Sequence, residues 1–416
     1  MTIVFVNPVG VIGGGERVLL TIMAALRTAS PSQELHLILG TDGPLVESAQ
    51  RLGVQVKVLK LPDQASQLGD SALKGNSRVT AVLMVLFQIA TTLPAIAQYL
   101  VEFRRTIREI DPDLIHSNGI KTHLLTSLAG IKGIPIVWHI HDFYGSRPLI
   151  ARVLRLMSDK AAIAIAISSA VAQDAKATLP NLPVEVIYNA VDVNYFSPAL
   201  VNLEVGKSED ASNSSIQNPK SKIQNREIRV GLVATFARWK GHEVFLDAAA
   251  QIIRDHPDLN IRFYIVGGAI YKTKGSQFSE QELQERASVL EIEDKVIFMG
   301  FQQNIADVYR MLDIVVHAST QPEPFGLAIV EAMACGKPVI VSQAGGAAEL
   351  FTDKYDAVGV EPGNAKSLAL AIAFLIDNPT QRQLLSENAR KSAVKRFSHD
   401  RLGQQILAVY RRFYAF

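Results

Sequence analysis

Short apolar segments rich in Val and Ile alternate with longer segments of helical periodicity over most of the chain. Continuous apolar runs of this kind are typical of strands that are buried on both faces. The alternation therefore predicts parallel sheets covered by helices on both sides. The predicted strands are 2–6, 34–40, 55–59, 113–117, 134–139, 162–167, 184–188, 228–234, 260–266, 295–298, 313–317 and 338–341. Helices are expected to begin near Gly15, Pro44, Val79, Ile120, Pro148 and Ser169.

A polar segment at residues 198–227 interrupts the alternation. It is rich in Ser, Asn, Lys, Glu and Gln and repeats the tripeptide Ile-Gln-Asn. Polar composition without apolar periodicity predicts a disordered linker. We therefore expect an N-terminal α/β domain over 1–197, the linker insert over 198–227, a C-terminal α/β domain over 228–395, and a basic helix over 396–416 that could pack back on the N-terminal domain.

Charge and cysteine content narrow the range of partners. The 416 residues contain 42 Lys+Arg and 40 Asp+Glu, a net charge of +2, whereas nucleic-acid-binding proteins usually show a clear basic excess. We expect no nucleic-acid partner. Cys335 is the single cysteine, which excludes an intrachain disulfide; this fits a reducing compartment, although the absence of a bridge is also compatible with export. The N-terminus lacks the basic region and cleavage site of a signal peptide.

Val79–Val101 contains 23 consecutive residues without a charge, a length that could span a bilayer. Polar residues and Pro94 dilute it, which favours a buried or interfacial helix. Cations follow it, and further arginines lie beside aromatic residues at the C-terminus; these are Arg104, Arg105, Arg108, Arg411 and Arg412. The pattern predicts peripheral association with the anionic inner face of a membrane. The alternative is a core helix with solvated cations.

Two loops of the first domain follow predicted strands and could carry chemistry. In the Gly13–Arg17 loop, Gly14 and Gly15 would let backbone N–H groups approach a phosphate at a helix N-terminus. The alternative is an ordinary strand-to-helix turn. His139 and His141 end another strand, and His141 lies nearer the loop, where it could act as acid, base or hydrogen-bond donor. No Cys or carboxylate cluster accompanies the two histidines, so we expect no metal there.

Three loops of the second domain also follow strands. Arg238 and Lys240 precede a helix and could pair with a diphosphate, although they could equally be solvated cations. Glu323 lies between two prolines in an extended loop. The next helix should begin near Phe325, Gly326 and Leu327, whose N–H groups would face an anion. Glu331, inside this helix, faces an apolar run and needs partners such as ribose hydroxyls; the alternative is that Glu323 and Glu331 are two unrelated surface glutamates. Glu349 ends a further Gly-Gly-Ala-Ala-Glu loop.

These motifs together resemble the retaining glycosyltransferases of family 4. Glu323 and Glu331 form the E-x7-E arrangement inside E-P-F-G-L-A-I-V-E-A-M-A-C-G-K-P-V-I. Lys240-Gly241, the G-G-A-A-E loop, the G-G-x-E-R match at residues 13–17 and Asn189-Ala190-Val191-Asp192 add to the resemblance. The sequence departs from the family where Ala234-Thr235 replaces the usual Gly-Arg, so that Arg238 could supply the missing guanidinium.

The resemblance implies a GT-B fold, in which two Rossmann-like α/β domains face a cleft. It also implies transfer of a sugar, with retention and without a metal or other cofactor, from a UDP- or GDP-sugar to a glycan, lipid or small-molecule acceptor. Glu323, His141, Arg238 and Lys240 would then be catalytic. Donor-binding residues would be Glu331, Gly14, Gly15, Phe325, Gly326, Leu327 and Glu349. The alternatives are a nucleotide-sugar epimerase or hydrolase on the same fold, and a membrane-associated nucleotide-binding protein without turnover.

Overall fold

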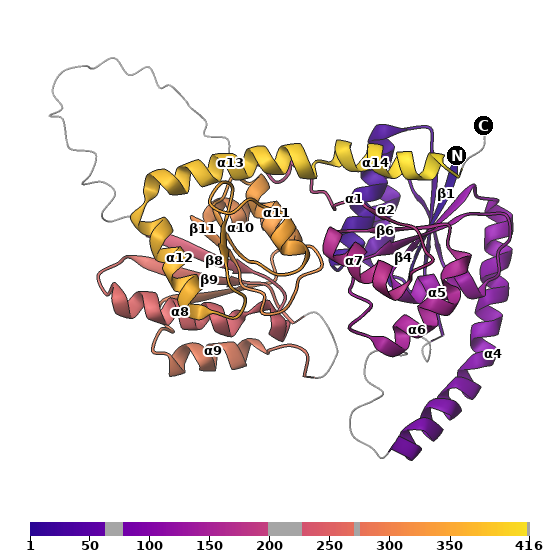
Figure 1. Ribbon diagram of the computed structural model, residues 1–416, viewed down its shortest axis with the longest axis horizontal. Coiled ribbons are helices and arrows are strands. Elements are labelled where there is room, and N and C mark those ends of the chain that lie inside the picture. Colours follow the sequence, from indigo (N-terminus) through magenta and orange to yellow (C-terminus); the bar gives the residue numbers. More distant parts are fainter. Residues whose placement is uncertain (63–77, 199–226, 270–274, 414–416) are drawn as a thin grey trace. The chain divides into compact units, whose positions relative to one another are not determined.

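A computed structural model describes residues 1–62, 78–198, 227–269 and 275–413, with the side chains of 78–93 excluded. Most of the segment predicted to be a linker lies outside the described residues. The chain forms two compact units, which are described separately (Figure 1). Unit 1 comprises Met1–Asp192 and Phe397–Phe416, and unit 2 comprises Val193–Arg396.

Unit 1 is built on a seven-stranded parallel sheet. Its strand order is β3-β2-β1-β4-β5-β6-β7, with helices on both faces (Figure 1). The strands are β1 (Thr2–Asn7), β2 (Glu34–Leu39), β3 (Gln55–Val58), β4 (Leu114–Asn118), β5 (Ile136–Ile140), β6 (Ile163–Ala166) and β7 (Val184–Val186). The helices are α1 (Gly14–Ala29), α2 (Pro44–Arg51), α4 (Arg78–Ile110), α5 (Ile120–Leu128), α6 (Pro148–Met157), α7 (Ser169–Thr178) and α14 (His399–Arg411).

The C-terminal helix α14 packs on α1 within unit 1. A Cβ atom at Gly403 would lie 2.5 Å from the carbonyl oxygen of Ala25, so glycine permits the close approach of the two helices. Tyr410 of α14 is buried, and its hydroxyl lies 2.6 Å from Nδ1 of the buried His116. Helix α14 is therefore anchored to the core of unit 1.

Unit 2 contains a six-stranded parallel sheet with the order β10-β9-β8-β11-β12-β13. The strands are β8 (Ile228–Val233), β9 (Ile261–Val266), β10 (Val296–Gly300), β11 (Ile314–His317), β12 (Val339–Ser342) and β13 (Val358–Val360). The helices are α8 (His242–Asp255), α9 (Glu280–Val289), α10 (Ile305–Met311), α11 (Leu327–Ala334), α12 (Ala365–Asp377) and α13 (Pro379–Phe397), the last of which runs one residue into unit 1.

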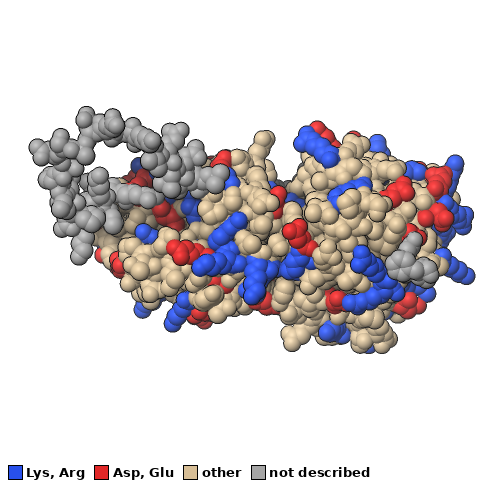
Figure 2. Space-filling model, turned by 90° about the horizontal axis from the view of Figure 1, so that it is seen from above, with Lys and Arg blue, Asp and Glu red and all other residues tan. Residues whose placement is uncertain are grey.

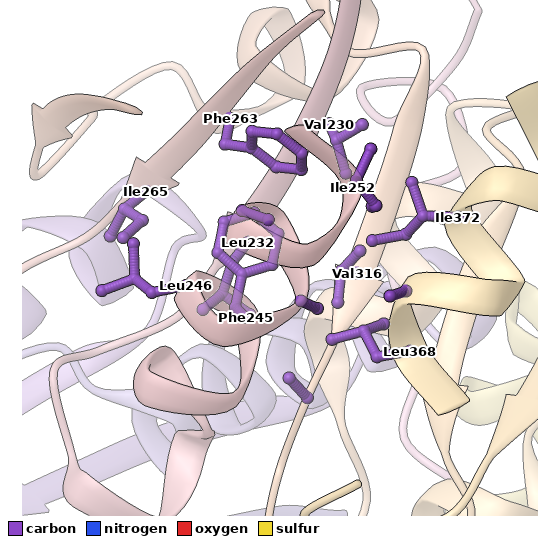
Figure 3. Close-up of a cluster of buried hydrophobic side chains, with 14 of the residues drawn as sticks. Val230, Leu232, Phe245, Leu246, Ile252, Phe263, Ile265, Val316, Leu368 and Ile372 are labelled. Atoms are coloured by element: carbon purple, nitrogen blue, oxygen red, sulfur yellow. The ribbon is translucent and has the colours of Figure 1, made fainter. Parts of the chain in front are cut away.

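The core of unit 2 lies between the sheet and the helices α8 and α12. Phe245 of α8 packs edge to face on Phe263 of β9, with ring centroids 5.8 Å apart. Leu368 and Ile372 of α12 lie near Val316 of β11 (Figure 3). This apolar core fixes the strands whose ends carry the polar loops.

Every predicted strand is present within two residues of its predicted limits, which confirms the parallel α/β interpretation. Strand β13 was not predicted, because its middle residue is Gly359 and the turn-forming sequence Glu-Pro-Gly follows it. The uncharged segment Val79–Val101 lies in α4, whose second half packs through the buried Tyr99, Phe103 and Ile107. Within the described parts of the chain, no helix is long and apolar enough to cross a membrane. Lys and Arg side chains are interspersed with Asp and Glu on the face shown in Figure 2.

The strand order reverses at one point in each sheet. In unit 1 the chain continues outward from β1 on one side and from β4 on the other, and in unit 2 the same holds for β8 and β11. Ligands of open parallel sheets bind outside the carboxyl ends of the strands at such switch points. The loops after β1, β4, β8 and β11 are therefore where a site is expected.

Candidate active site

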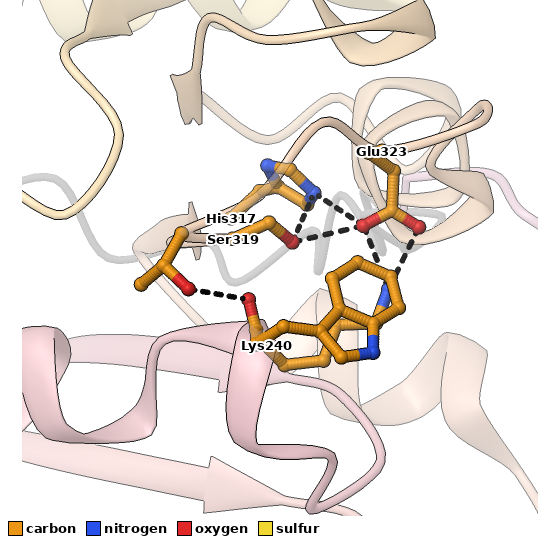
Figure 4. Close-up of polar contacts among 6 residues, drawn as sticks. Lys240, His317, Ser319 and Glu323 are labelled. Carbon is orange, nitrogen blue, oxygen red and sulfur yellow. Dashed lines mark hydrogen bonds and ion pairs between the residues drawn. The ribbon is translucent and has the colours of Figure 1, made fainter. Parts of the chain in front are cut away.

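A buried ion pair lies at the switch point of unit 2. Lys240, after β8, places Nζ 2.7 Å from Oε1 and 2.8 Å from Oε2 of Glu323, after β11. Ser319 donates from its hydroxyl to the Glu323 carboxylate at 2.8 Å, and Nε2 of His317 lies 3.3 Å from it (Figure 4). The Glu323 carboxylate thus has three polar neighbours from two adjacent strand ends.

Two glycines allow these loops to come together. Gly241 has φ 78°, and a Cβ there would lie 1.8 Å from the carbonyl oxygen of Ala318. Gly345 has φ 64°, and a Cβ there would lie 2.6 Å from the carbonyl oxygen of Glu323. Any other residue at either position would be strained and would push the loops apart. The N–H of Gly346 donates to that Glu323 carbonyl at 2.7 Å, which fixes the backbone beneath the carboxylate.

The electrostatics keep Glu323 ionised. It is only 7% exposed, and burial alone would raise its pKa. The Lys240 charge and the hydrogen bond with His317 outweigh burial, so that the pKa lies below the usual range of a glutamate. The Lys240 ammonium also lies 4.1 Å from the centroid of the Trp239 ring, a cation–π contact.

Arg238 contacts different residues from those that Lys240 contacts. Its guanidinium lies 2.6 Å from Oε1 of Glu282 and 4.2 Å above the ring of Phe278. Hydrogen bonds from Ser279 and Arg238 lower the pKa of Glu282 to about 2. Because Arg238 and Glu282 are both nearly half exposed, their ion pair contributes little to stability. The two predicted cations therefore bind different carboxylates: Arg238 pairs with Glu282, and Lys240 pairs with Glu323.

Helix α11 begins directly after the loop that carries Glu323. Gly326 is its N-cap with φ 103°, and no side chain caps the helix there. Backbone N–H groups at such a helix start are donors for an anion. Phe325, just before the N-cap, is buried, and Leu327 is the first helical residue.

The two remaining predicted glutamates of unit 2 also have protein partners. Glu331 of α11 is 6% exposed and accepts a 2.8 Å hydrogen bond from the hydroxyl of Tyr309, a partner that the sequence did not reveal. Glu349 ends the short 3-10 helix at Gly346–Glu349, and its carbonyl accepts from Arg396 at 2.6 Å. The Tyr309 hydroxyl thus supplies one of the hydrogen-bond donors that the buried Glu331 carboxylate needs.

In unit 1, Gly14 and Gly15 open helix α1. The Glu16 carboxylate accepts from the N–H of Gly13 at 3.0 Å, which caps the helix from within. Added Cβ atoms at Gly14 or Gly15 would meet nothing within 4 Å. The protein's own packing therefore does not require these two glycines, and the space beside them is open for a ligand.

His141 follows β5 and belongs to a row of polar side chains. Its Nε2 lies 2.6 Å from Oδ1 of Asn118, at the end of β4, and Asn118 donates to Oδ1 of Asn7, at the end of β1, at 2.7 Å. Burial lowers the pKa of His141 to about 4. His139 is fully buried, with Nδ1 3.3 Å from Nε2 of His116.

Sequence reasoning missed four polar residues that complete these arrangements. They are Asn7, Asn118, His317 and Ser319. Each lies at or just beyond the carboxyl end of an apolar strand next to a switch point, and that position is the signal that could have revealed them. Groups of three or more His, Cys, Asp or Glu able to hold a metal are absent from the described ranges.

Comparisons with known proteins agree with this architecture. The family model described as Glycosyltransferase Family 4 matches residues 44–195, and that described as Glycosyl transferases group 1 matches residues 213–392. An uncharacterized glycosyltransferase of Methanocaldococcus jannaschii is 25% identical over 72% of this chain and 75% of its own. N-acetyl-alpha-D-glucosaminyl L-malate synthase of Bacillus anthracis is 27% identical over 72% of this chain and 74% of its own.

A solved structure matches both units. The crystal structure of HepE from Anabaena in complex with UDP has a TM-score of 0.75 and 26% identity, over 99% of this chain and 100% of that one. The two family models cover most of the described chain between them. The resemblance drawn from the motifs is confirmed: the chain belongs to the family 4 glycosyltransferases with the GT-B fold.

Proposed function

We propose that the protein is a retaining glycosyltransferase that uses a nucleotide-diphosphate sugar and needs no metal or other cofactor. The observation that carries this proposal is the buried Lys240–Glu323 pair at the switch point of unit 2. Support also comes from HepE, whose structures hold UDP and, in another crystal, UDP and glucose. We assign the nucleoside of the donor to the unit 2 domain and the acceptor, a glycan, lipid or small molecule, to the unit 1 domain.

The proposed chemistry is electrostatic. As the bond between the anomeric carbon and the diphosphate oxygen breaks, the leaving diphosphate gains charge. Lys240 and the N–H groups at Gly326 and Leu327 would stabilise that charge in a preorganised arrangement. Arg238 would join them by leaving Glu282, which costs little because that ion pair is solvated.

The remaining predicted residues would hold the donor. Glu331 would accept from the ribose hydroxyls beside Tyr309, and Glu323 from hydroxyls of the sugar. Phe325 and Glu349 would shape the nucleotide side of the site. Gly14 and Gly15, in the first turn of α1 with open space beside them, would offer backbone N–H groups to the diphosphate, and His141 would contact the sugar.

Retention requires the acceptor oxygen to bond the anomeric carbon on the face that the diphosphate leaves. We propose that a leaving phosphate oxygen takes the acceptor proton, so that neither Glu323 nor Glu331 serves as nucleophile. The ionised state of Glu323, held by Lys240, suits a hydrogen-bond acceptor better than a general acid.

The test is a panel of UDP- and GDP-sugars, scored by binding and by NMR of the anomeric proton in the product. The proposal expects one donor to bind and the product to keep the donor's anomeric configuration, with activity unchanged in EDTA. An inverted product, or activity lost in EDTA and restored by a divalent ion, would overturn retention or metal independence. Rapid consumption of donor without any acceptor would favour the epimerase or hydrolase alternative.

We also propose peripheral binding to the anionic cytoplasmic face of a membrane, through a surface other than the one that the sequence suggested. Arg104 donates to the carbonyl of Ala129, Arg105 pairs with Glu109 at 2.9 Å, and Arg412 pairs with Glu185 at 2.6 Å. These arginines are already engaged with the protein. They therefore offer less to a lipid headgroup than the sequence suggested.

Helix α6 of unit 1 presents a better surface. Leu149, Val153 and Leu156 stand on one stripe of the helix and are exposed by 63%, 38% and 77%. Arg152 and Arg155 are exposed beside that stripe, and neither has an ion pair with any residue that the structure describes. An apolar stripe flanked by cations complements an anionic lipid surface.

Liposome flotation tests this contact. Replacing Arg152 and Arg155 by Gln removes two cations worth about 1 kcal/mol each, so binding to anionic liposomes should fall about 30-fold. Arg105→Gln is the matched control, because Arg105 already pairs with Glu109. Absence of binding at low salt contradicts the proposal, and salt-resistant binding that only detergent releases would indicate an inserted helix instead.

A further inference from the structure

Three polar side chains at the ends of neighbouring strands of unit 1 form a directed chain of hydrogen bonds. We propose that Asn7 and Asn118 hold His141 as the neutral tautomer protonated on Nε2, so that Nδ1 accepts a hydrogen bond from a hydroxyl of the donor sugar. Asn7 and Asn118 are then positioning residues, and His141 recognises the sugar. The hydroxyl role rests on the proposed function, whereas the tautomer follows from unit 1 alone.

The direction of these hydrogen bonds is set at Asn7, the residue farthest from His141 in the row. Asn7 Nδ2 lies 2.7 Å from the carbonyl oxygen of Val9 and 3.4 Å from Oε1 of Glu16. A carbonyl only accepts, and an ionised carboxylate only accepts. The amide nitrogen of Asn7 must therefore face these two oxygens, which leaves its Oδ1 to face Asn118.

The same reasoning passes the direction to the histidine. Because Asn7 presents Oδ1, the group of Asn118 that lies 2.7 Å away must be its amide nitrogen. Asn118 then presents Oδ1 to Nε2 of His141 at 2.6 Å, and that nitrogen must carry a hydrogen. The opposite tautomer would place two lone pairs against each other at this distance.

Burial makes the arrangement rigid. Asn7 is 1% and Asn118 is 3% exposed, so water cannot readily replace the missing partner of a flipped amide. The His139 ring lies 4.2 Å from the His141 ring, centroid to centroid, and limits its rotation. The strands themselves set the spacing, since β1 pairs with β4 and β4 pairs with β5.

The consequence concerns what His141 can recognise. Among the residues that the structure describes, none donates a hydrogen bond to Nδ1 of His141. This nitrogen is also not one of the buried polar atoms that lack a partner, so a ligand can reach it. A neutral ring with this tautomer offers a lone pair, which suits a hydroxyl that donates. Burial lowers the pKa of His141 to about 4, so at pH 7 the ring is uncharged and offers no positive charge to the diphosphate. The tautomer therefore favours contact of His141 with a sugar hydroxyl over contact with the charged diphosphate.

Nitrogen NMR of the full chain labelled on its histidines tests the tautomer directly, with His141→Gln used to assign the signal. We expect Nε2 protonated and Nδ1 unprotonated at pH 7 in the parent. Asn118→Leu, which removes the oxygen acceptor facing Nε2, should release the ring into a mixture of tautomers. A cationic ring or an Nδ1–H tautomer in the parent, or an unchanged tautomer in Asn118→Leu, would overturn the inference.

Calorimetry with UDP and UDP-glucose tests the hydroxyl role. His141→Gln and Asn118→Leu should weaken UDP-glucose binding about tenfold and leave UDP binding unchanged, because His141 contacts only the sugar. Equal loss for both ligands, or no loss for either, would overturn the role of His141 while the parent's binding of UDP-glucose still supports the proposed function. If the parent binds neither ligand, both the UDP-sugar donor and the hydroxyl role fail, and the NMR result alone decides the tautomer.

Discussion

Removing Lys240 should destabilise unit 2 strongly, because it would leave the Glu323 carboxylate buried without its cation. Glu323 is 7% exposed, and its charge is balanced by Lys240 at 2.7 Å. Breaking a buried ion pair from one side typically costs about 3–5 kcal/mol. The hydrogen bond from Ser319 remains in Lys240→Met, so we take the lower end, about 3 kcal/mol. For a unit the size of Val193–Arg396 this corresponds to a fall of roughly 6–12 °C in its Tm.

Fluorescence can follow unit 2 separately. The chain has two tryptophans, Trp138 in unit 1 and Trp239 in unit 2, so a Trp138→Phe background leaves only Trp239, which stacks on Lys240. The matched control is the double variant Lys240→Met with Glu323→Gln, which removes both charges. It should lose about 1 kcal/mol or less relative to the parent, since a neutral pair leaves no buried charge.

The pH dependence gives a second check with a defined sign. In the parent, the lowered pKa of Glu323 stabilises unit 2 above the ordinary glutamate pKa, and this contribution is lost as the pH falls. In Lys240→Met burial acts without the cation and raises the pKa of Glu323, so the carboxyl group protonates more readily. The difference between parent and variant should therefore shrink from pH 7 toward pH 4. A Lys240→Met protein within about 0.5 kcal/mol of the parent at pH 7, or a difference independent of pH, would refute the buried-charge reasoning.

Three further predictions concern other parts of the chain. Glu331→Ala should weaken UDP binding about tenfold in calorimetry, since a lost charged hydrogen bond is worth about 1.5–3 kcal/mol, whereas Tyr309→Phe should keep it; equal binding by Glu331→Ala and the parent would remove the ribose role. Deleting residues 203–222, whose composition is polar and aperiodic, should leave the melting temperature and donor binding nearly unchanged, and a large fall in Tm would contradict the linker prediction. Burial lowers the pKa of His116 to about 3 and of His141 to about 4, so the unfolded chain binds protons first as the pH falls below about 6.5; unit 1 should lose up to about 2 kcal/mol per histidine at pH 5 in urea titrations, and a stability that rises between pH 6.5 and 5 would contradict this.

The sequence predicted the fold well because parallel strands buried on both faces leave an unambiguous apolar pattern. Strands such as β1, β6 and β12 follow it closely, whereas β3 and β7 alternate apolar and polar residues and are only partly buried. The short β13 (Val358–Val360) has a glycine at its centre and is followed by the turn-forming sequence Glu-Pro-Gly, so its pattern is not distinguished from a loop. Its place is set by pairing with β12, which is a tertiary interaction.

Only those residues of the candidate site that belong to a recognisable sequence motif could be predicted. Glu323, Lys240 and Glu331 could be selected because their residue types and spacing are unusual beside apolar runs. His317 and Asn118 were missed although each ends a strand, because only the order of the strands shows that β11 and β4 lie beside switch points. Arg238 shows the reverse case: its sequence position beside Lys240 suggested a shared ligand, yet Glu282 and Phe278 on a distant segment determine where its guanidinium lies.

The most direct test of the central claim is calorimetric titration of the parent and of Glu323→Gln with the panel of UDP- and GDP-sugars, with product formation followed in the same samples. The account predicts that at least one nucleotide sugar binds the parent and releases its nucleotide, and that Glu323→Gln binds the free nucleotide normally but loses sugar transfer or slow donor hydrolysis. If no nucleotide sugar binds the parent, or if Glu323→Gln turns the donor over at the parent's rate, the buried Lys240–Glu323 pair is not the centre of a sugar-transfer site.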